Sequence, residues 1–208
     1  MPMTTLRSPG VRSPGELAER AARRRRTVAL GPRARYHGPM ADYQRISHGF
    51  DPVFDEHSRV LVLGSFPSVL SRENRFYYGN PRNRFWRVMS DVLGEPLPAV
   101  DDVDAKRALL LRHGVALWDV IESCDVRGSS DASIRNVVPA DVARITGAAP
   151  VGAVLCNGGT AGRLYRRWLE PVTGIAAEVL PSTSPANASW SLERLEARWR
   201  EALLAALG

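Results

Sequence analysis

The chain has 208 residues, of which 44% are apolar, and its formal net charge is +6. This length and apolar content suit one folded domain with a sizeable core, together with a tail. No apolar run approaches the ~20 residues that cross a bilayer, and the arginine-rich N-terminus lacks the apolar segment of a secretory signal. We therefore expect a cytoplasmic protein, in the cytosol or nucleoid of a bacterium, with no membrane partner.

The few cysteines and histidines argue against metal and disulfide chemistry. The two cysteines, Cys124 and Cys156, are too few for a disulfide framework or an iron–sulfur cluster, and the four histidines are scattered. We expect no metal and no cofactor. Lys106 is the sole lysine and lies outside every candidate motif, so Schiff-base chemistry is not expected.

Residues 1–45 are predicted to be a disordered, basic N-terminal extension. Residues 1–47 hold ten arginines against three acidic residues, whereas the rest of the chain has 18 basic and 19 acidic residues. The extension contains two Ser-Pro and two Gly-Pro pairs and little that can be buried. The alternatives are translation from Met40 and a DNA-binding arm. The folded domain is expected to span residues 46–208 and to be nearly neutral.

From residue 58 onward, apolar strand-like runs alternate with amphipathic helix-like segments. The predicted strands are residues 59–63, 115–118, 151–155 and 175–180. The predicted helices are residues 83–93, 101–112, 139–146, 160–169 and 187–207. This alternation predicts a parallel sheet covered by helices on both faces, with ligands bound at the carboxyl ends of the strands. Three loops fall at those ends, namely residues 64–71, 156–160 and 181–188.

The first loop reads GSFPS and begins at Gly64. Gly64 lets a backbone approach a ligand closely, and Pro67 stiffens the turn. Aromatic residues interleaved with arginines follow, and residues 59–87 hold six arginines and one acid. Arginines among flat aromatic rings suit a flat ligand joined to phosphate, such as a nucleobase in a strand. The alternative for Phe85 and Trp86 is core packing on the helix that follows.

Two asparagines adjoin these loops. Asn83 opens a predicted helix, where it can act as an N-cap or present its amide to a water or a base edge. Asn157 directly follows a predicted strand, and its amide offers the donor and acceptor that complement a base edge. The alternative for Asn157 is a turn residue. Cys156 is interpreted as a buried structural thiol rather than a nucleophile.

The third loop, LPSTSPANA at residues 180–188, holds three hydroxyls and two prolines. Hydroxyl and amide groups in such a loop can hold phosphates without demanding a sequence. The alternative is an ordinary helix N-cap at Ser184 or Asn187.

Together the three loops resemble those of the uracil-DNA glycosylase superfamily, and within it the hypoxanthine-DNA glycosylase branch, often called family 6. The stretches that carry the resemblance are GSFPS (64–68), YYGNPRNRFW (77–86), LCNGGTAG (155–162) and LPSTSPANA (180–188). The resemblance implies an α/β fold, a three-layer αβα sandwich with a central four-stranded, mainly parallel sheet. It also implies a monofunctional enzyme that flips a deaminated base from DNA and hydrolyses its N-glycosidic bond.

The resemblance also assigns the site residues. Asn83 would carry catalysis, Asn157 would recognise the base edge, and Tyr78 or Phe85 would stack on the base. The remaining expected substrate-binding residues line the pocket or grip phosphates: Gly64, Ser65, Phe66, Pro67, Ser182, Thr183, Ser184 and Asn187. Phe66 stands where better-known uracil branches have Asp or Asn, and Leu180 where they often have histidine. Without those groups, the mechanism must depend on stabilising the leaving base.

The function expected from sequence is therefore a DNA-deoxyinosine glycosylase without lyase activity, acting as a monomer on DNA that contains a deaminated base. One alternative is a uracil- or mismatch-specific DNA glycosylase. Another is a non-catalytic nucleic-acid-binding module on the same fold. A third is an α/β hydrolase using Ser65 or Ser68, although the G-x-S-x-G elbow is absent.

Overall fold

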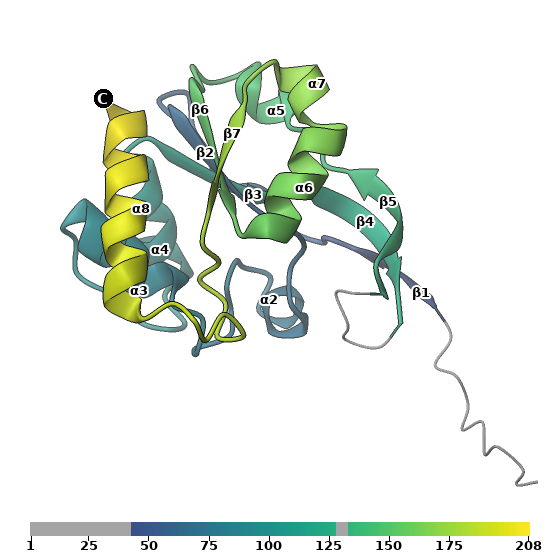
Figure 1. Ribbon diagram of the computed structural model, residues 1–208, viewed down its shortest axis with the longest axis horizontal. Coiled ribbons are helices and arrows are strands. Elements are labelled where there is room, and N and C mark those ends of the chain that lie inside the picture. The colour runs from purple at the N-terminus through teal and green to yellow at the C-terminus, as the bar shows by residue number, and fades with distance from the viewer. Residues whose placement is uncertain (1–42, 128–132) are drawn as a thin grey trace, which may run out of the picture. The chain divides into compact units, whose positions relative to one another are not determined.

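A computed structural model describes residues 43–127 and 133–208. Nearly all of the predicted N-terminal extension lies outside these residues. The central sheet has four parallel strands in the order β3-β2-β6-β7 (Figure 1). Its strands are β2 (Val60–Gly64), β3 (Val115–Asp119), β6 (Ala153–Asn157) and β7 (Ala177–Leu180). The predicted fold class and the four predicted strands are confirmed.

Helices cover both faces of this sheet (Figure 1). One layer consists of α3 (Phe85–Leu93), α4 (Val103–Arg112) and α8 (Leu192–Leu207). In this layer α8 contacts α3 and three strands, and α4 contacts β3. The other layer consists of α5 (Ala143–Thr146), α6 (Gly159–Trp168) and α7 (Glu170–Thr173), where α6 contacts β6 and β7. Within the described ranges, no helix has both the length and the apolar character needed to cross a membrane.

Burial explains why these segments form the elements they do. All five residues of β2 and all five of β3 are buried, as continuous apolar runs in a sheet covered on both faces should be. The helix α3 ends at Leu93, and its C-cap is Gly94, whose φ of 69° lies in the left-handed region that favours glycine. Phe85 and Trp86 are both buried on this helix, as the core-packing alternative predicts.

A second, antiparallel sheet was not predicted. It has the order β1-β4-β5 and consists of β1 (Gln44–Ser47), β4 (Ile121–Val126) and β5 (Arg135–Pro139). Its outer strands are short and mostly exposed or half-buried, so they lack the apolar pattern that identifies a strand in sequence. Only Val120 separates β3 from β4, so the chain passes directly from one sheet to the other.

Two predicted helices are wrong in extent. The predicted helix at 139–146 is only the four-residue α5, and Pro139 ends β5, an edge strand where a missing N–H is tolerated. The predicted helix at 187–207 begins at Leu192, because Ser191 caps it by accepting the Arg194 N–H at 3.3 Å. A short helix after the first loop, α2 (Val69–Glu73), was also not predicted.

The packing of α6 on β7 depends on Gly162. A Cβ atom at this position would lie 2.3 Å from Cγ2 of Val179. We expect Gly162→Ala to lower the free energy of unfolding by about 1–3 kcal/mol in urea titrations, because a stiff branched side chain must move. Adding Val179→Ala should recover much of this loss. Gly152→Ala is the control, since a Cβ there meets no atom within 4 Å. A Gly162→Ala variant as stable as Gly152→Ala would contradict this packing.

Candidate active site

A cavity of about 460 Å³ opens at the carboxyl ends of the parallel strands. Gly64 at the end of β2, Asp119 at the end of β3 and Asn157 at the end of β6 all line it. Residues of the loop after β7 complete the wall. Its volume lies in the ordinary range for ligand cavities, and its position is the one expected for a ligand site in this fold.

Most of the predicted site residues meet in this cavity. Those that line it are Gly64, Ser65, Phe66, Pro67, Tyr78, Asn83, Asn157, Ser182, Ser184 and Asn187. Phe85 and Thr183 do not line it, and both are fully buried. The Phe85 ring stacks against the ring of Tyr78, with centroids 4.0 Å apart and planes 22° apart. Tyr78 is therefore the ring that reaches the cavity, and Phe85 supports it from the core.

The amide of Asn83 has a fixed orientation. Its Oδ1 accepts the Phe85 N–H at 3.0 Å and the Thr183 hydroxyl at 2.9 Å. A backbone N–H can only donate, so the atom facing Phe85 must be the oxygen. Both lone pairs of Oδ1 are thereby used at the start of α3. The Nδ2 hydrogens, which no described residue accepts, are the groups that Asn83 can offer to the cavity.

Hydrogen bonds within the protein also fix the amide of Asn157. Its Nδ2 donates to the Tyr78 hydroxyl and to Oγ1 of Thr183, each at 2.9 Å. Its Oδ1 accepts the Thr183 N–H, again at 2.9 Å. Both N–H groups of this amide are therefore engaged inside the protein, and one lone pair on Oδ1 is left. Asn157 orders Tyr78 and Thr183 and presents an acceptor, rather than a donor and an acceptor, to the cavity.

Thr183 connects the two asparagines. Its hydroxyl accepts from Asn157 and donates to Asn83, so the direction of this chain of hydrogen bonds is set. Thr183 was predicted to bind the substrate together with the rest of the last loop. The structure instead places it behind the cavity wall, where it joins the end of β6 and the start of α3 to the last loop.

Arg84 holds the last loop in place. Its guanidinium donates to four backbone carbonyls, those of Thr183, Ser184, Asn187 and Trp190. The sequence suggested a phosphate-binding patch that included Arg84. In the structure its guanidinium N–H groups instead donate to carbonyls of the protein itself. Arg75, Arg82 and Arg87 from the same segment are exposed.

The backbone and hydroxyl of Tyr78 are both unusual. Its φ of 52° lies in the left-handed region, which a bulky residue adopts only where its surroundings impose it. Burial, and secondarily the charge of Asp119, raises the pKa of Tyr78 far above the ordinary value of a phenol. The hydroxyl therefore keeps its proton while its oxygen accepts from Asn157.

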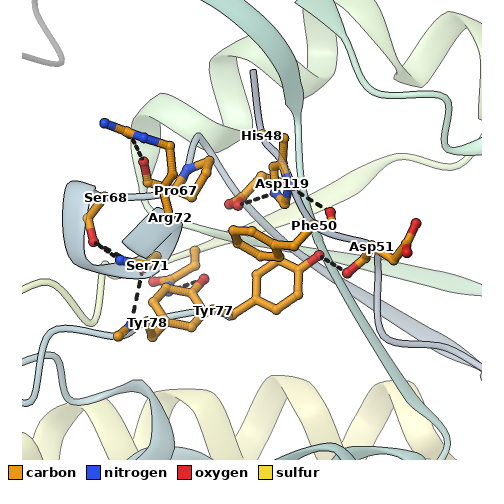
Figure 2. A network of polar contacts seen from close by, with 12 residues as sticks. His48, Phe50, Asp51, Pro67, Ser68, Ser71, Arg72, Tyr77, Tyr78 and Asp119 are labelled. Carbon is orange, nitrogen blue, oxygen red and sulfur yellow. Dashed lines mark hydrogen bonds and ion pairs between the residues drawn. The ribbon is translucent and has the colours of Figure 1, made fainter. Parts of the chain in front are cut away.

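An acid and a histidine at this site were not predicted from the sequence. Asp119 has the one charged side chain among the described residues that line the cavity, and that side chain is 6% exposed. Its Oδ2 lies 2.9 Å from Nε2 of His48, and Nδ1 of His48 lies 2.9 Å from the Phe50 carbonyl oxygen (Figure 2). A polar residue directly after the predicted strand at 115–118 was the available signal for Asp119. His48 had none, because it follows an unpredicted strand.

In the described ranges no group of three or more histidine, cysteine or acidic side chains could hold a metal ion. Cys156 is fully buried, and burial raises the pKa of its thiol to about 12. The thiol is therefore uncharged near pH 7, which supports its interpretation as a structural residue.

Thr183 offers a direct test of this geometry. Thr183→Val removes the hydroxyl, so one N–H of Asn157 loses its acceptor and Oδ1 of Asn83 loses one of its two donors, which should cost about 1–3 kcal/mol of stability. Thr183→Ser keeps the hydroxyl and is the matched control, expected to be the more stable variant. Urea unfolding of both proteins measures the difference. Equal stability of the two variants would show that the hydroxyl does not join the asparagines.

Comparison with known proteins identifies the family. The model of the uracil DNA glycosylase superfamily matches residues 52–208. A hypoxanthine DNA glycosylase of Methanosarcina acetivorans is 36% identical over 155 residues, which are 74% of this chain and 96% of the relative. One of Methanosarcina barkeri is 34% identical over the same shares of both chains.

A solved structure agrees with these relatives. The solution NMR structure of a candidate uracil DNA glycosylase from M. acetivorans superposes with a TM-score of 0.66 and 33% identity. It covers 79% of this chain and 100% of its own. These matches confirm the predicted resemblance to the superfamily. They also confirm the predicted class of activity, that of a DNA glycosylase, for which DNA is the substrate. The chain belongs to the uracil DNA glycosylase superfamily.

Proposed function

We propose that this protein releases hypoxanthine from deoxyinosine in DNA by hydrolysing the N-glycosidic bond. The observation that carries the proposal is that Asn83 and Asn157 line one cavity and are joined through Thr183. The names of the two Methanosarcina relatives support hypoxanthine as the base. Lys106 donates to the Val100 carbonyl and lies over the Trp86 ring, away from the cavity, which supports a glycosylase without lyase activity.

The cavity walls suit an extruded base. A base that is paired inside a duplex cannot enter such a cavity, so the nucleotide must be flipped out first. The Tyr78 ring, supported by Phe85, offers one flat surface. Phe66 offers a second ring at the cavity, with the Arg72 guanidinium 5.6 Å from its centroid. Such rings stack on any base, so selection must come from polar groups.

Asn83 acts in this proposal as a hydrogen-bond donor. Its free Nδ2 hydrogens can hold the oxygen of the attacking water or a developing negative charge on the base. An uncharged amide is no general base. Cleavage of the C1′–N9 bond therefore runs ahead of water attack, and the sugar becomes oxocarbenium-like. The neutral Tyr78 hydroxyl is a second donor for the charge that develops on the leaving base.

The rim of the cavity suits the sugar–phosphate backbone. Gly159 and Thr160 open α6 at the cavity, where the first N–H groups of a helix lack helical partners. The hydroxyls of Ser182 and Ser184 lie on the same rim. Such groups bind phosphates without reading sequence. The proposal includes action as a monomer, in the cytosol or nucleoid where DNA is found.

Uracil is the second candidate base. The matching superfamily and the related NMR structure carry its name. Uracil also has a carbonyl beside a ring N–H, as hypoxanthine does, so the same polar groups can contact it.

A base-release panel tests the function. Oligonucleotides with one inosine, uracil, xanthosine or adenosine, in single- and double-stranded form, are incubated with excess protein. We expect free hypoxanthine from the inosine strand, with the strand cut only after alkali. No base release at high protein excess, with DNA binding intact, would favour the non-catalytic binding module.

Substitution of Asn83 tests its part in the reaction. Asn83→Ala should lower the single-turnover rate on inosine by about 100-fold or more, a loss typical of removing one positioned donor. The affinity for DNA should change far less. Asn83→Asp keeps an oxygen for the Phe85 N–H but loses both Nδ2 hydrogens, so it should be as slow as Asn83→Ala. An active Asn83→Asp enzyme would show that an acceptor or base is needed there, and equal losses of rate and affinity would remove Asn83 from catalysis.

A further inference from the structure

One face of the antiparallel sheet takes no part in the reaction described above. The opposite face holds the apolar side chains of this sheet, which pack against Phe66 of the cavity and Leu164 of α6. Side chains alternate between the two faces of a strand, so the polar residues lie on the solvent face. Arg45, Asp125 and Arg135 are register partners across its three strands. The sheet is thus fixed to the cavity wall on one side and open to solvent on the other.

The arginines of this solvent face differ in their partners. The guanidinium of Arg45 is used within the sheet, where it donates to Asp125 and to the Asn136 carbonyl. Arg127 and Arg135 are both exposed. Within residues 43–127 and 133–208, neither of their guanidinium groups forms an ion pair or a hydrogen bond. Two positively charged groups on this face are therefore available to a partner.

The ring of Tyr43 orders both of these arginines. Tyr43 directly precedes β1 and Arg127 directly follows β4, so the two residues lie at the same end of the sheet. The guanidinium carbon of Arg135 lies 3.2 Å from the centroid of the Tyr43 ring, and that of Arg127 lies 5.6 Å from it. A guanidinium that lies over a ring keeps the N–H groups at its edge for other acceptors. We call Tyr43, Arg127 and Arg135 the arginine cluster.

The arginine cluster lies outside the cavity but is tied to its wall. The Ile121 N–H at the start of β4 donates to the carbonyl of Ser65, which lines the cavity, at 3.1 Å. A strand rises ~3.4 Å per residue, so Arg127 lies roughly 20 Å along the chain from Ile121. In Figure 1 the far end of β4 and the helix α2, which follows the cavity loop, lie on the same side of the central sheet. The cluster therefore flanks the side of the protein where DNA reaches the cavity.

The phosphate groups of a duplex suit this cluster in charge, geometry and spacing. Each guanidinium has a planar fork that can donate two parallel hydrogen bonds to one phosphate. Each strand of B-DNA rises ~3.4 Å per nucleotide, so the distance from the cavity corresponds to roughly 4–6 base pairs. Phosphate contacts orient a protein on DNA without reading its sequence. This property suits a surface that lies away from the base to be released.

We propose that the arginine cluster binds the sugar–phosphate backbone of the duplex, roughly 4–6 base pairs to one side of the extruded nucleotide. The inference rests on the function proposed above, because an extruded base in the cavity sets the position of the DNA. Arg127 and Arg135 contact the phosphates, and Tyr43 orients both guanidinium groups. The cavity then selects the base, while the antiparallel sheet adds affinity and fixes the direction of the duplex.

The salt dependence of binding tests the contact. Duplexes with one 2′-fluoro-deoxyinosine, which resists hydrolysis, are titrated at several KCl concentrations. The double variant Arg127→Gln/Arg135→Gln should bind about 10-fold more weakly, or worse, near about 0.1 M KCl. The slope of log Kd against log[KCl] should fall by about 1.8, since each lost phosphate contact lowers it by about 0.9.

A control variant accounts for the loss of net charge. Arg166 and Arg167 are exposed in the last turn of α6, at the end of that helix away from the cavity. Arg166→Gln/Arg167→Gln removes the same charge and should leave the salt slope unchanged.

Conservative variants separate charge from folding. Arg127→Lys/Arg135→Lys keeps both charges but loses the planar forks, so its affinity should fall while its salt slope stays near that of the wild type. Tyr43→Phe keeps the ring and should bind as the wild type does, whereas Tyr43→Leu should bind more weakly.

Shortened duplexes test the position of the contact. One duplex ends about 3 base pairs to the 5′ side of the inosine, and a second ends about 3 base pairs to its 3′ side, which removes phosphates at the distance set by β4. The wild type and Arg127→Gln/Arg135→Gln should bind one of these duplexes equally. On the other duplex they should differ as much as on the full-length one.

Three outcomes would overturn the inference. The first is an Arg127→Gln/Arg135→Gln variant with the Kd and salt slope of Arg166→Gln/Arg167→Gln, which would favour an acidic partner protein for the cluster. The second is a loss of affinity that persists on both shortened duplexes. The third is a salt slope that falls as far with lysine as with glutamine at these positions.

The same proteins distinguish this inference from the proposed function. Release of hypoxanthine by the wild type, with Arg127→Gln/Arg135→Gln binding like the control, would refute the contact and leave the proposed function standing. A loss of affinity and salt slope in that variant, with no base released by the wild type, would refute the proposed function and leave the contact standing.

Discussion

Three hydrogen bonds of 2.9 Å join Thr183 to Asn157 and Asn83, and they decide which atoms of both amides face the cavity. The Thr183 carbonyl is used as well, since it accepts from the backbone and the side chain of Arg84. Every polar atom of this fully buried residue is therefore engaged. Because backbone N–H groups anchor the chain of hydrogen bonds at Thr183 and Phe85, neither amide can turn over without leaving a buried donor unpaired.

The polar groups of the cavity therefore have fixed roles as hydrogen-bond donors or acceptors. Asn83 and Tyr78 present donors, while Asn157 and Asp119 present acceptors. A nucleobase edge also mixes donors and acceptors, so a cavity with both kinds in fixed places can select among bases. Arg84 contributes to this order by holding the carbonyls of the last loop rather than phosphate. Arg84 thus has a structural role in the site, whereas Arg75, Arg82 and Arg87 from the same segment are exposed.

The parallel sheet and the position of the site could be predicted from the sequence. Buried strands appear there as apolar runs, and the loops after them are rich in glycine and hydroxyl-bearing residues. It placed Asn83 and Asn157 at strand and helix ends, but it could not give the direction of either amide. That direction depends on Thr183, which is distant in sequence from Asn83. The His48–Asp119 pair was out of reach for a similar reason, since it depends on a second sheet whose outer strands have no apolar pattern. The sequence also could not tell which aromatic ring reaches the cavity. In the structure Tyr78 lines the cavity, whereas Phe85 lies in the core.

A crystal structure of the protein with a duplex containing 2′-fluoro-deoxyinosine would show whether Asn83 and Asn157 share one extruded nucleotide. We expect the hypoxanthine ring inside the cavity against Tyr78, with Nδ2 of Asn83 near the glycosidic bond and Oδ1 of Asn157 at the base. A complex in which the inosine stays stacked in the duplex, or in which the base binds away from either asparagine, would contradict this expectation.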